Sequence, residues 1–317
     1  MDEPAYLGKL RCPACRAGTP TRNMSGDALR CAQCGACYPV SAGVPVLLRP
    51  DNDVFSIESY LRRAPRAASS RSPLAKFVPS PSLNLSRDEA LKAMRQALDR
   101  QGAGAILVVG GGRQRSWLTP TMQATTPHSL VYTDVDCGAD VDIFCDAHDL
   151  PFEDGAFDAV VTTAVIEHVL YPEAVAEEIG RVLKLGGLLY SELPFMQQVH
   201  EGAYDFTRYT LSGHRRLFRH FMELRSGMVA GPATALVWAI ENFFLAFVSG
   251  QRARWLTKIA ARIAFSWMKY FDHVLVHKSQ AMDGASCTYF FGSKTADSVS
   301  NAEIIRRYVG AKHLRHT

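Results

Sequence analysis

Short apolar runs alternate with segments of helical periodicity through the middle of the chain. Five runs are typical of buried parallel strands: Ala105–Val109, Leu130–Thr133, Ile143–Cys145, Phe157–Thr162 and Leu188–Leu193. Between the last two, residues 172–184 place their apolar side chains on one face of a predicted helix, which Gly186-Gly187 would end. Strands that alternate with helices predict βαβ units and a mostly parallel α/β sheet.

Two further helices and a last strand are predicted around this core. Ser86 and Glu89 have capping-box spacing, so a helix is expected to begin there and to bury Leu91, Met94 and Leu98. A second helix is expected over Leu211–Phe221, capped by Thr210, with His214 and His220 on its surface. Ser286–Phe291 would be the returning last strand.

Residues 233–278 have an unusual hydrophobic pattern. Ala233–Val248 is apolar except for Glu241-Asn242, which makes it too short and too polar for a membrane span. The segment 251–278 places basic residues on one face and Trp255, Ile259 and Ile263 on another. A helical lid over a substrate cleft is the favoured interpretation, and a helix lying on a membrane surface is the alternative.

Length, composition and charge narrow the class of protein. The chain has 317 residues, of which 47% are apolar and 21% charged, so it is a globular protein of two domains or one large one. The formal net charge of +4 is too small to indicate nucleic-acid binding by itself. The sequence begins Met1-Asp2-Glu3-Pro4 without an apolar core segment, so no signal peptide is indicated and a cytoplasmic location is expected.

The cysteines indicate a metal site near the N-terminus. Two C-x2-C pairs, Cys12/Cys15 and Cys31/Cys34, are separated by fifteen residues, a spacing typical of a structural zinc ribbon. Four thiolate ligands leave no open position on the ion, so a catalytic role is not expected. Four free thiols or two disulfides are the alternatives. Cys37 could replace one of these ligands, but a role as a small buried apolar residue is favoured.

The sequence divides into three parts. A zinc ribbon is expected over residues 1–50, a linker over 51–85 and an α/β domain over 86–317, with 200–280 as its substrate or lid region. Residues 62–82 contain four prolines and five basic residues but no acidic one, which is typical of a loosely ordered segment. Its charge indicates a solvated surface or a phosphate-rich partner.

A glycine cluster and an acidic residue indicate a nucleotide cofactor. Gly110-Gly111-Gly112 follows the first predicted strand, and Asp134 ends the second, 22 residues later. Glycines at such a turn let the main chain approach a ligand, and the carboxylate is placed to bind ribose hydroxyls. Nicotinamide dinucleotides and S-adenosylmethionine both fit this arrangement.

The next segments decide between these cofactors. Four segments resemble, in order, motifs of the class I S-adenosylmethionine-dependent methyltransferases of the UbiE/type 11 kind. The D-A-x-x-L-P-F motif matches Asp146–Phe152, and the F-D-x-V motif matches Phe157–Val160. The L-E-H-V motif matches Ile166–Val169, and the E-x-x-R-V-L-K-P-G-G motif matches Glu178–Gly187. The resemblance covers residues 104–195. The stretch Cys34–Leu48 resembles the end of a Trm112-type ribbon.

The resemblance implies a Rossmann-like class I methyltransferase fold with a seven-stranded sheet, and a role for each matching residue. The turn Gly110, Gly111 and Gly112 would lie under the methionine moiety of S-adenosylmethionine, and Asp134 would bind its ribose. Asp146 and the amide of Ala147 would hold the adenine edge, while Thr163 and Ala164 would line the methionine side and His168 would face the catalytic pocket. Val108 and Gln114 replace the early Asp and the last Gly of the family loop.

The segment after the fifth strand contains several side chains that could bind or activate an acceptor. His200 is the expected general base, Asp205 would orient it or act as the base, and Arg208 would clamp an anionic group of the acceptor. His168 is the competing base, and an Asp–Arg pair that only staples the loop is the structural alternative. The order P-F, H, D-F-x-R-Y-T resembles bacterial family members associated with sugar or cell-surface polymer pathways.

These observations predict O-methylation of a small-molecule or saccharide acceptor. An RNA methyltransferase that grips nucleic acid with the ribbon and residues 62–76 is the alternative, and salt would weaken its binding steeply. A non-catalytic scaffold that only binds the cofactor is a third hypothesis, which predicts no product with any acceptor.

Overall fold

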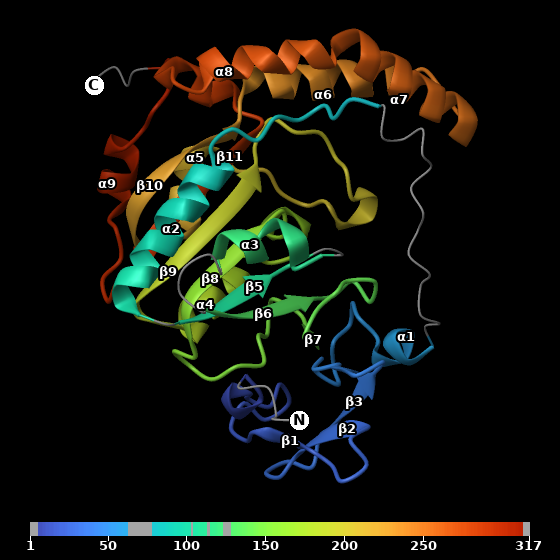
Figure 1. The fold of residues 1–317 in the computed structure, drawn as a ribbon, viewed down its shortest axis with the longest axis vertical. Helices are drawn as coiled ribbons and strands as arrows, with labels where there is room; N and C mark the ends of the chain where they lie inside the picture. The colour runs from blue at the N-terminus through green and yellow to red at the C-terminus, as the bar shows by residue number, and fades with distance from the viewer. Residues whose placement is uncertain (1–5, 63–77, 103, 113–114, 123–127, 313–317) are drawn as a thin grey trace.

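The computed structural model describes residues 6–62, 78–102, 104–112, 115–122 and 128–312. A central α/β domain carries a small antiparallel sheet at one end and a pair of long helices at the opposite end (Figure 1). Gln114 and residues 63–77 of the predicted linker lie outside the described residues.

The central sheet has seven strands in the order β10-β11-β9-β8-β5-β6-β7 (Figure 1). Strands β5 to β9 are parallel to one another, and β11 is antiparallel to both β9 and β10. The predicted α/β architecture is confirmed. The strands are β5 (Ala105–Val109), β6 (Ser129–Asp134), β7 (Ile143–Phe144), β8 (Phe157–Thr163), β9 (Leu183–Pro194), β10 (Phe221–Ala230) and β11 (Cys287–Lys294).

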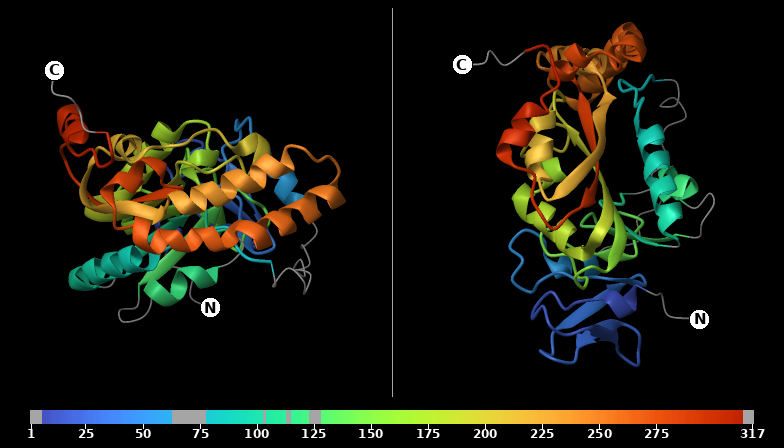
Figure 2. Two further views of the ribbon diagram at one scale, coloured as in Figure 1. Left: turned by 90° about the horizontal axis from the view of Figure 1, so that it is seen from above. Right: turned by 90° about the vertical axis from the view of Figure 1, so that its left-hand side faces the viewer.

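Helices cover both faces of this sheet. On one face lie α2 (Arg87–Gln101) and α3 (Thr119–Met122), and on the other lie α4 (Pro172–Val182), α5 (Leu211–Leu217) and α9 (Asn301–Arg306), as Figure 2 shows. Leu91, Met94 and Leu98 are buried as predicted. The predicted capping box is wrong, because the Ser86 side chain makes no cap hydrogen bond and Glu89 pairs with Arg225 at 2.7 Å.

Two predicted helices are shorter than expected, and one strand was missed. The helix over 172–184 ends at Val182, because the chain enters β9 there, and Gly186-Gly187 lies inside that strand. The helix over 211–221 ends at Leu217, and β10 begins at Phe221. His220 is exposed as expected, but His214 is fully buried, because its ring bonds the hydroxyls of Ser191 and Thr288 on the sheet.

The N-terminal sheet is packed onto the β7 edge of the central sheet. Its strands are β1 (Pro20–Arg22), β2 (Ala28–Cys31), β3 (Cys37–Ser41) and β4 (Val44–Pro45). Val46 forms a bridge with Phe144, and the Leu47 amide donates to the Phe144 carbonyl at 2.8 Å. The short helix α1 (Ile57–Leu61) packs there too, since the Tyr60 hydroxyl donates to the Val135 carbonyl. Residues 51–62 therefore belong to the folded body and are no free linker.

The helical insertion lies between β10 and β11. It contains the α-helices α6 (Pro232–Leu245), α7 (Gln251–Phe265) and α8 (Asp272–Leu275) and the 3-10 helices η6 (Ser266–Phe271) and η7 (Ser279–Gly284). No helix among the described residues is long and apolar enough to cross a membrane.

Candidate functional site

A cleft of about 1050 Å³ opens at the carboxyl ends of β5, β6 and β8, where open α/β sheets bind their ligands. It brings together most of the residues that the sequence singled out, although they come from distant parts of the chain. None of residues 211–278 lines this cleft, so the helical insertion does not form the predicted lid. The predicted residues that line it are Gly110, Gly112, Asp134, Asp146, Ala147, Thr163, Ala164, His168 and His200.

Gly110 and Gly112 have backbone conformations that favour glycine, and both line the cleft without side chains. Gly110 has φ +75°, and a Cβ there would lie 2.0 Å from Cγ2 of Val165, so a side chain is excluded. Gly112 has φ +65°, and its amide donates to the Asp134 carboxylate at 2.9 Å. Gly111 packs against Tyr132 and does not line the cleft.

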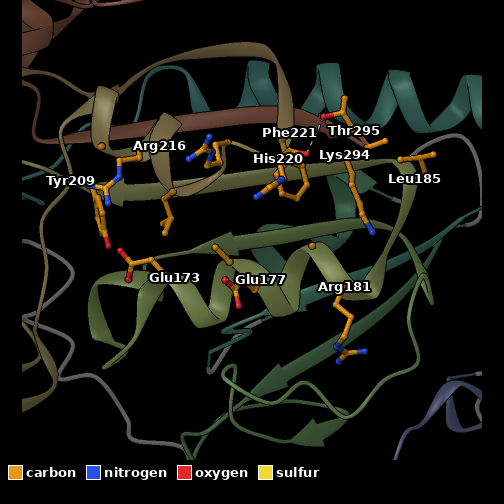
Figure 3. A pocket seen from close by; sticks show the side chains of 16 residues that line it. Glu173, Glu177, Arg181, Leu185, Tyr209, Arg216, His220, Phe221, Lys294 and Thr295 are labelled. Carbon is orange, nitrogen blue, oxygen red and sulfur yellow. Dashed lines mark hydrogen bonds between the residues drawn. The ribbon is translucent and has the colours of Figure 1, made fainter. Parts of the chain in front are cut away.

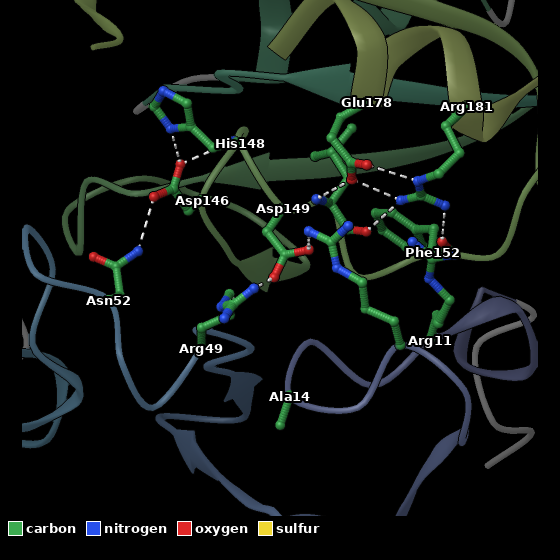
Figure 4. A network of polar contacts seen from close by, with 12 residues as sticks. Arg11, Ala14, Arg49, Asn52, Asp146, His148, Asp149, Phe152, Glu178 and Arg181 are labelled. Atoms are coloured by element: carbon green, nitrogen blue, oxygen red, sulfur yellow. Dashed lines mark hydrogen bonds and ion pairs between the residues drawn. The ribbon is translucent and has the colours of Figure 1, made fainter. Parts of the chain in front are cut away.

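Asp134 and Asp146 lie on neighbouring strand ends but are held differently. Burial raises the pKa of Asp134, whose second oxygen accepts from the Asp136 amide. Burial also opposes ionisation of Asp146, but hydrogen bonds from His148 outweigh it and lower the pKa of that carboxyl. The His148 ring lies 2.6 Å from Asp146, and the Asn52 amide donates to the other oxygen at 2.8 Å (Figure 4).

The E-x-x-R motif of α4 supports the loop that carries Asp146 and Ala147. Arg181 donates to the Leu150 and Phe152 carbonyls and pairs with Glu178 at 2.7 Å (Figure 4). Glu178 in turn accepts from the Leu150 amide at 2.8 Å. The motif is therefore structural, because it fixes the loop from behind and does not reach the cleft.

One wall of the cleft comes from a segment that sequence reasoning missed. Arg49, Asn52 and Phe55 line it, although residues 49–55 looked like a ribbon end followed by a linker. The Phe55 ring stacks at 6.5 Å on Tyr204, which lies across the cleft mouth. No motif or periodicity marks this segment, so nothing in the sequence could have indicated its role.

Two histidines face each other at the other end of the cleft. Nε2 of His168 lies 3.2 Å from Nε2 of His200, with the rings edge to face. His168 follows β8 on η4 (Ile166–His168), and His200 follows β9. Burial lowers the pKa of His168. The neighbouring Glu167 is 1% exposed, and burial raises the pKa of its carboxyl to about 7.

Asp205 and Arg208 form an ion pair that staples the loop, which is the structural alternative to a role in binding the acceptor. Arg208 pairs with Asp205 and donates to the Gln197 carbonyl at 2.8 Å and to the Gln198 carbonyl at 3.2 Å. Asp205 also accepts from the His200 amide at 2.8 Å. Although desolvation of the Asp205 side chain, which is 1% exposed, opposes ionisation, its hydrogen bonds with Arg208 hold the pKa of the carboxyl far below its ordinary value. The pair thus holds the loop that carries His200, and neither residue lines the cleft.

The four predicted ribbon cysteines converge. The Sγ atoms of Cys12 and Cys34 are 3.7 Å apart, as are those of Cys15 and Cys31, and all four lie within 4.8 Å of one another. Thiolates at about 2.3 Å from a tetrahedral zinc ion are about 3.8 Å apart, so the cluster is consistent with a zinc site. Cys37 is exposed, contrary to prediction, and is not in the cluster.

A second cavity of about 590 Å³ lies between α4 and α5, away from the carboxyl ends of β5, β6 and β8 (Figure 3). Glu173 and Glu177 line it together with Arg216 and Lys294. None of the residues proposed to bind the cofactor or the acceptor reaches it. The cleft at the strand ends is therefore the candidate active site.

The sheet order and the strand-end cleft define the fold as that of a class I methyltransferase. The family model Methyltransf_11, described as "Methyltransferase domain", matches residues 109–191, a range that runs from the glycine turn through β8 and η4 into β9. The chain therefore contains an S-adenosylmethionine-dependent methyltransferase domain.

Solved structures with similar folds have low sequence identity to this chain. One chain from the complex between the Haloferax volcanii Trm112 methyltransferase activator and a methyltransferase is 16% identical, with a TM-score of 0.38 over 68% of this chain and 96% of its own. The Haemonchus contortus phosphoethanolamine N-methyltransferase 2 is 14% identical, with a TM-score of 0.38 over 66% of this chain and 56% of its own. No curated protein matches the sequence.

Proposed function

We propose that the protein transfers a methyl group from S-adenosylmethionine to a hydroxyl of a small-molecule or saccharide acceptor. One observation carries this proposal. A single cleft joins the glycine turn and Asp134 at one end to the His168–His200 pair at the other. A bound cofactor and an acceptor would therefore meet in front of two imidazoles.

The cofactor end fits the proposed ligand. Gly110 and Gly112 line the cleft without side chains, and a Cβ at Gly112 would meet nothing within 4 Å, so the methionine part can lie against this turn with Thr163 and Ala164 beside it. Each oxygen of Asp134 accepts one main-chain hydrogen bond and retains capacity for a ribose hydroxyl. Asp146, steadied by His148 and Asn52, would hold the adenine edge with the Ala147 amide.

The residues at the acceptor end would align and deprotonate the nucleophile. When bound, S-adenosylmethionine supplies a methyl group on a positively charged sulfur. His200 is the proposed base, and His168 is the competing one, because an imidazole can take a hydroxyl proton as the oxygen attacks. The Asp205–Arg208 pair would act only by positioning His200. Alignment of oxygen, methyl and sulfur supplies much of the rate.

The charges around the cleft favour a neutral acceptor over RNA. The lining contains seven carboxylate side chains and two arginines: Asp51, Asp53, Asp134, Asp136, Asp146, Asp149, Glu201, Arg16 and Arg49. A phosphate backbone would be repelled by this excess of negative charge. The segment 62–76, which the RNA hypothesis also used, lies largely outside the described residues.

Transfer of a labelled methyl group tests the proposal. The purified protein should methylate a member of a panel of saccharides and small polyols and leave RNA unlabelled. His200→Ala should slow turnover by about 10²–10⁴-fold while S-adenosylhomocysteine affinity changes less than about twofold. Asp134→Ala should weaken S-adenosylhomocysteine by about 1.5–3 kcal/mol. Cofactor binding without product from any acceptor would support the scaffold hypothesis, and labelled RNA would overturn the choice of acceptor.

We also propose that the N-terminal sheet is a Trm112-like structural zinc ribbon. The support is the closed set of four sulfurs and the absence of the cluster from the cleft lining. An ion there would fix the fold of residues 6–48 and take no part in methyl transfer. Metal analysis should find about one zinc per chain.

A further proposal concerns the helical insertion, which we infer binds an anionic membrane surface. Its two helices lie side by side at the end of the molecule opposite the ribbon (Figure 2). Large apolar side chains of the insertion are exposed: Phe247, just after α6, is 74% exposed, Trp255 of α7 is 56% exposed and Trp267 of η6 is 57% exposed. Such aromatic residues are typical of the interface between water and lipid.

The charges on the insertion complement an anionic lipid surface. Residues 232–278 contain only two acidic side chains, Glu241 and Asp272, and both are buried. Glu241 pairs with Arg262 at 2.7 Å, so this arginine faces inward, while Arg252 and Arg254 are exposed. The outer surface therefore combines aromatic residues with uncompensated positive charge.

Vesicle sedimentation tests the membrane proposal. The protein should sediment with vesicles of phosphatidylcholine and phosphatidylglycerol, more weakly with phosphatidylcholine alone, and less at high salt. Replacing Trp255 and Trp267 by Ser should weaken binding by about tenfold or more, because each buried aromatic contributes about 1.5–3 kcal/mol. Leu185→Ser, at an equally exposed position outside the insertion, is the control. No sedimentation, or a dimer that the Trp variants abolish, would contradict lipid binding.

A further inference from the structure

The His168–His200 pair has an unusual hydrogen-bond arrangement. Nδ1 of His168 lies 2.7 Å from the Tyr204 carbonyl, and Nδ1 of His200 lies 3.2 Å from the Gln198 carbonyl. A carbonyl oxygen only accepts, so each Nδ1 carries the proton. Both Nε2 atoms then present lone pairs to each other across 3.2 Å. Two facing lone pairs repel each other unless a proton or a metal cation lies between them.

A buried carboxylate completes the group. Oε1 of Glu167 lies 3.6 Å from Nε2 of His168, and Oε2 of Glu167 has no hydrogen-bond partner although the side chain is 1% exposed. An unpartnered buried oxygen is costly unless a ligand satisfies it. The ligand atoms of Glu167, His168 and His200 all lie within 4.8 Å of one another.

We propose that Glu167, His168 and His200 bind a divalent transition-metal ion. Two imidazoles and a carboxylate suit zinc, cobalt, iron(II) or manganese(II) and leave coordination positions open. Nitrogens bound to one ion at about 2.1 Å lie about 3.0–3.4 Å apart for angles from tetrahedral to octahedral, and the observed separation is 3.2 Å. The Nδ1–H bonds to carbonyls are the outer contacts that orient histidine ligands in metal sites.

The loop around Asp205 holds this geometry in place. The Glu167 carbonyl accepts from the Phe206 amide at 2.8 Å, which ties the loop to η4. The Asp205 carboxylate accepts from the His200 amide at 2.8 Å, and Arg208 fixes Asp205. The dense polar segment 200–208 thus sets His200 opposite His168.

The ion would select the acceptor, and this part rests on the proposed methyl transfer. An acceptor with two adjacent oxygens, such as a vicinal diol, could occupy the open positions in front of the cofactor. A cation lowers the pKa of a bound hydroxyl, so its proton leaves to water. The oxygen keeps that electron pair and bonds to the methyl carbon, while the C–S electron pair stays on sulfur. His200 is then a ligand and not the base.

Cobalt(II) binding to the full chain tests the site without any acceptor. The protein is first loaded with one zinc per chain at the cysteines, and Co²⁺ is then titrated by calorimetry and absorption. One equivalent should bind with a spectrum that lacks thiolate charge transfer. His200→Ala and the isosteric Glu167→Gln should each weaken this binding by more than about 100-fold, above the loss that outer contacts cause. His148→Ala removes another cleft imidazole and should leave Co²⁺ affinity within about threefold.

The outcomes separate the metal site from the enzyme activity. Unchanged S-adenosylhomocysteine affinity in Glu167→Gln would show that this variant is folded. If the zinc-loaded protein binds no Co²⁺, or binds one equivalent that survives both substitutions, the metal site is overturned whatever the activity. Co²⁺ binding that depends on Glu167 and His200 would support the site, even if every acceptor failed and the proposed methyl transfer had to be abandoned.

Discussion

The two appendages of the methyltransferase domain attach to its sheet in opposite ways. The ribbon is joined by apolar packing and main-chain hydrogen bonds, since Leu10, Leu29 and Tyr38 are fully buried in one cluster with residues of the central sheet. The helical insertion instead leaves Phe247 and Trp255 exposed. The ribbon is thus complete within one chain, while the insertion presents an apolar surface that a monomer does not cover.

The insertion is held together by buried carboxylates. Asp272 is fully buried and accepts from the amides of Gly231, Ala233 and Thr234, so it caps α6 from a distance of about forty residues in the chain. Glu241, in the middle of α6, pairs with Arg262 of α7. The Glu241 pair turns Arg262 inward, while Arg252, Arg254 and Trp255 of α7 stay exposed.

The largest expected effect comes from breaking the ribbon. Cys31→Ser should lower zinc from about one per chain to nearly zero and unfold residues 6–48, because a sheet this small has little core of its own. The cleft wall at residues 49–55 should loosen with it, so affinity for S-adenosylhomocysteine should fall. Metal analysis, hydrogen exchange and calorimetry measure the three effects.

Cys37→Ser is the matched control, because Cys37 is exposed and outside the cluster. It should keep the zinc and the cofactor affinity. A wild-type protein that contains no metal yet protects its ribbon amides would show that apolar packing alone holds this appendage.

The second prediction tests the polar attachment of the insertion. Asp272→Ala should destabilise the protein by about 2–4 kcal/mol, because it leaves three amides at the start of α6 without an acceptor. Urea unfolding measures this loss. Asp297→Ala, at an exposed position, should change stability by less than about 0.5 kcal/mol. Equal effects of the two substitutions would mean that the cap does not hold the insertion.

Sequence patterns predicted what depends on local residues and missed what depends on contacts between distant segments. The parallel strands followed from their apolar runs, and the glycine turn, Asp134 and His168 followed from motifs around those strand ends. Glu89 was wrongly assigned to a capping box and Asp272 was given no role, because their partners, Arg225 and the start of α6, are far away in sequence. The resemblance places the Glu167-His168 pair at the pocket but does not link Glu167 to His200, since only the fold brings these two residues together.

The third prediction concerns the sheet between the appendages. Burial lowers the pKa of His214 to about 3, below its ordinary value, so the unfolded chain binds a proton between pH 3 and 6.5 that the folded protein excludes. Stability should therefore fall by up to about 1.4 kcal/mol for each pH unit below 6.5. His214→Gln should flatten this dependence, and the exposed His220→Gln should not. The midpoints of urea unfolding, measured from pH 7 to pH 4, test this prediction. If stability falls with pH equally steeply in the wild type and in His214→Gln, His214 is not the source of the pH dependence.

The smallest expected effect tests whether the ribbon side reaches the cofactor. Asn52 donates to Asp146 at 2.8 Å, and it joins the segment after the ribbon to the proposed adenine site. Asn52→Ala removes one hydrogen bond to a carboxylate and should weaken S-adenosylhomocysteine by about 3–10-fold, or about 0.7–1.4 kcal/mol, with zinc content and melting temperature nearly unchanged. Asn23→Ala is the control, because Asn23 is exposed and bonds Asp27 within the ribbon. If both variants bind S-adenosylhomocysteine like the wild type, the segment after the ribbon forms a wall of the cleft but does not contribute to cofactor affinity through Asn52. A loss of affinity confined to Asn52→Ala would mean that the ribbon side also orients Asp146, a proposed cofactor-binding residue. The helical insertion has no such role, because none of its residues lines the cleft.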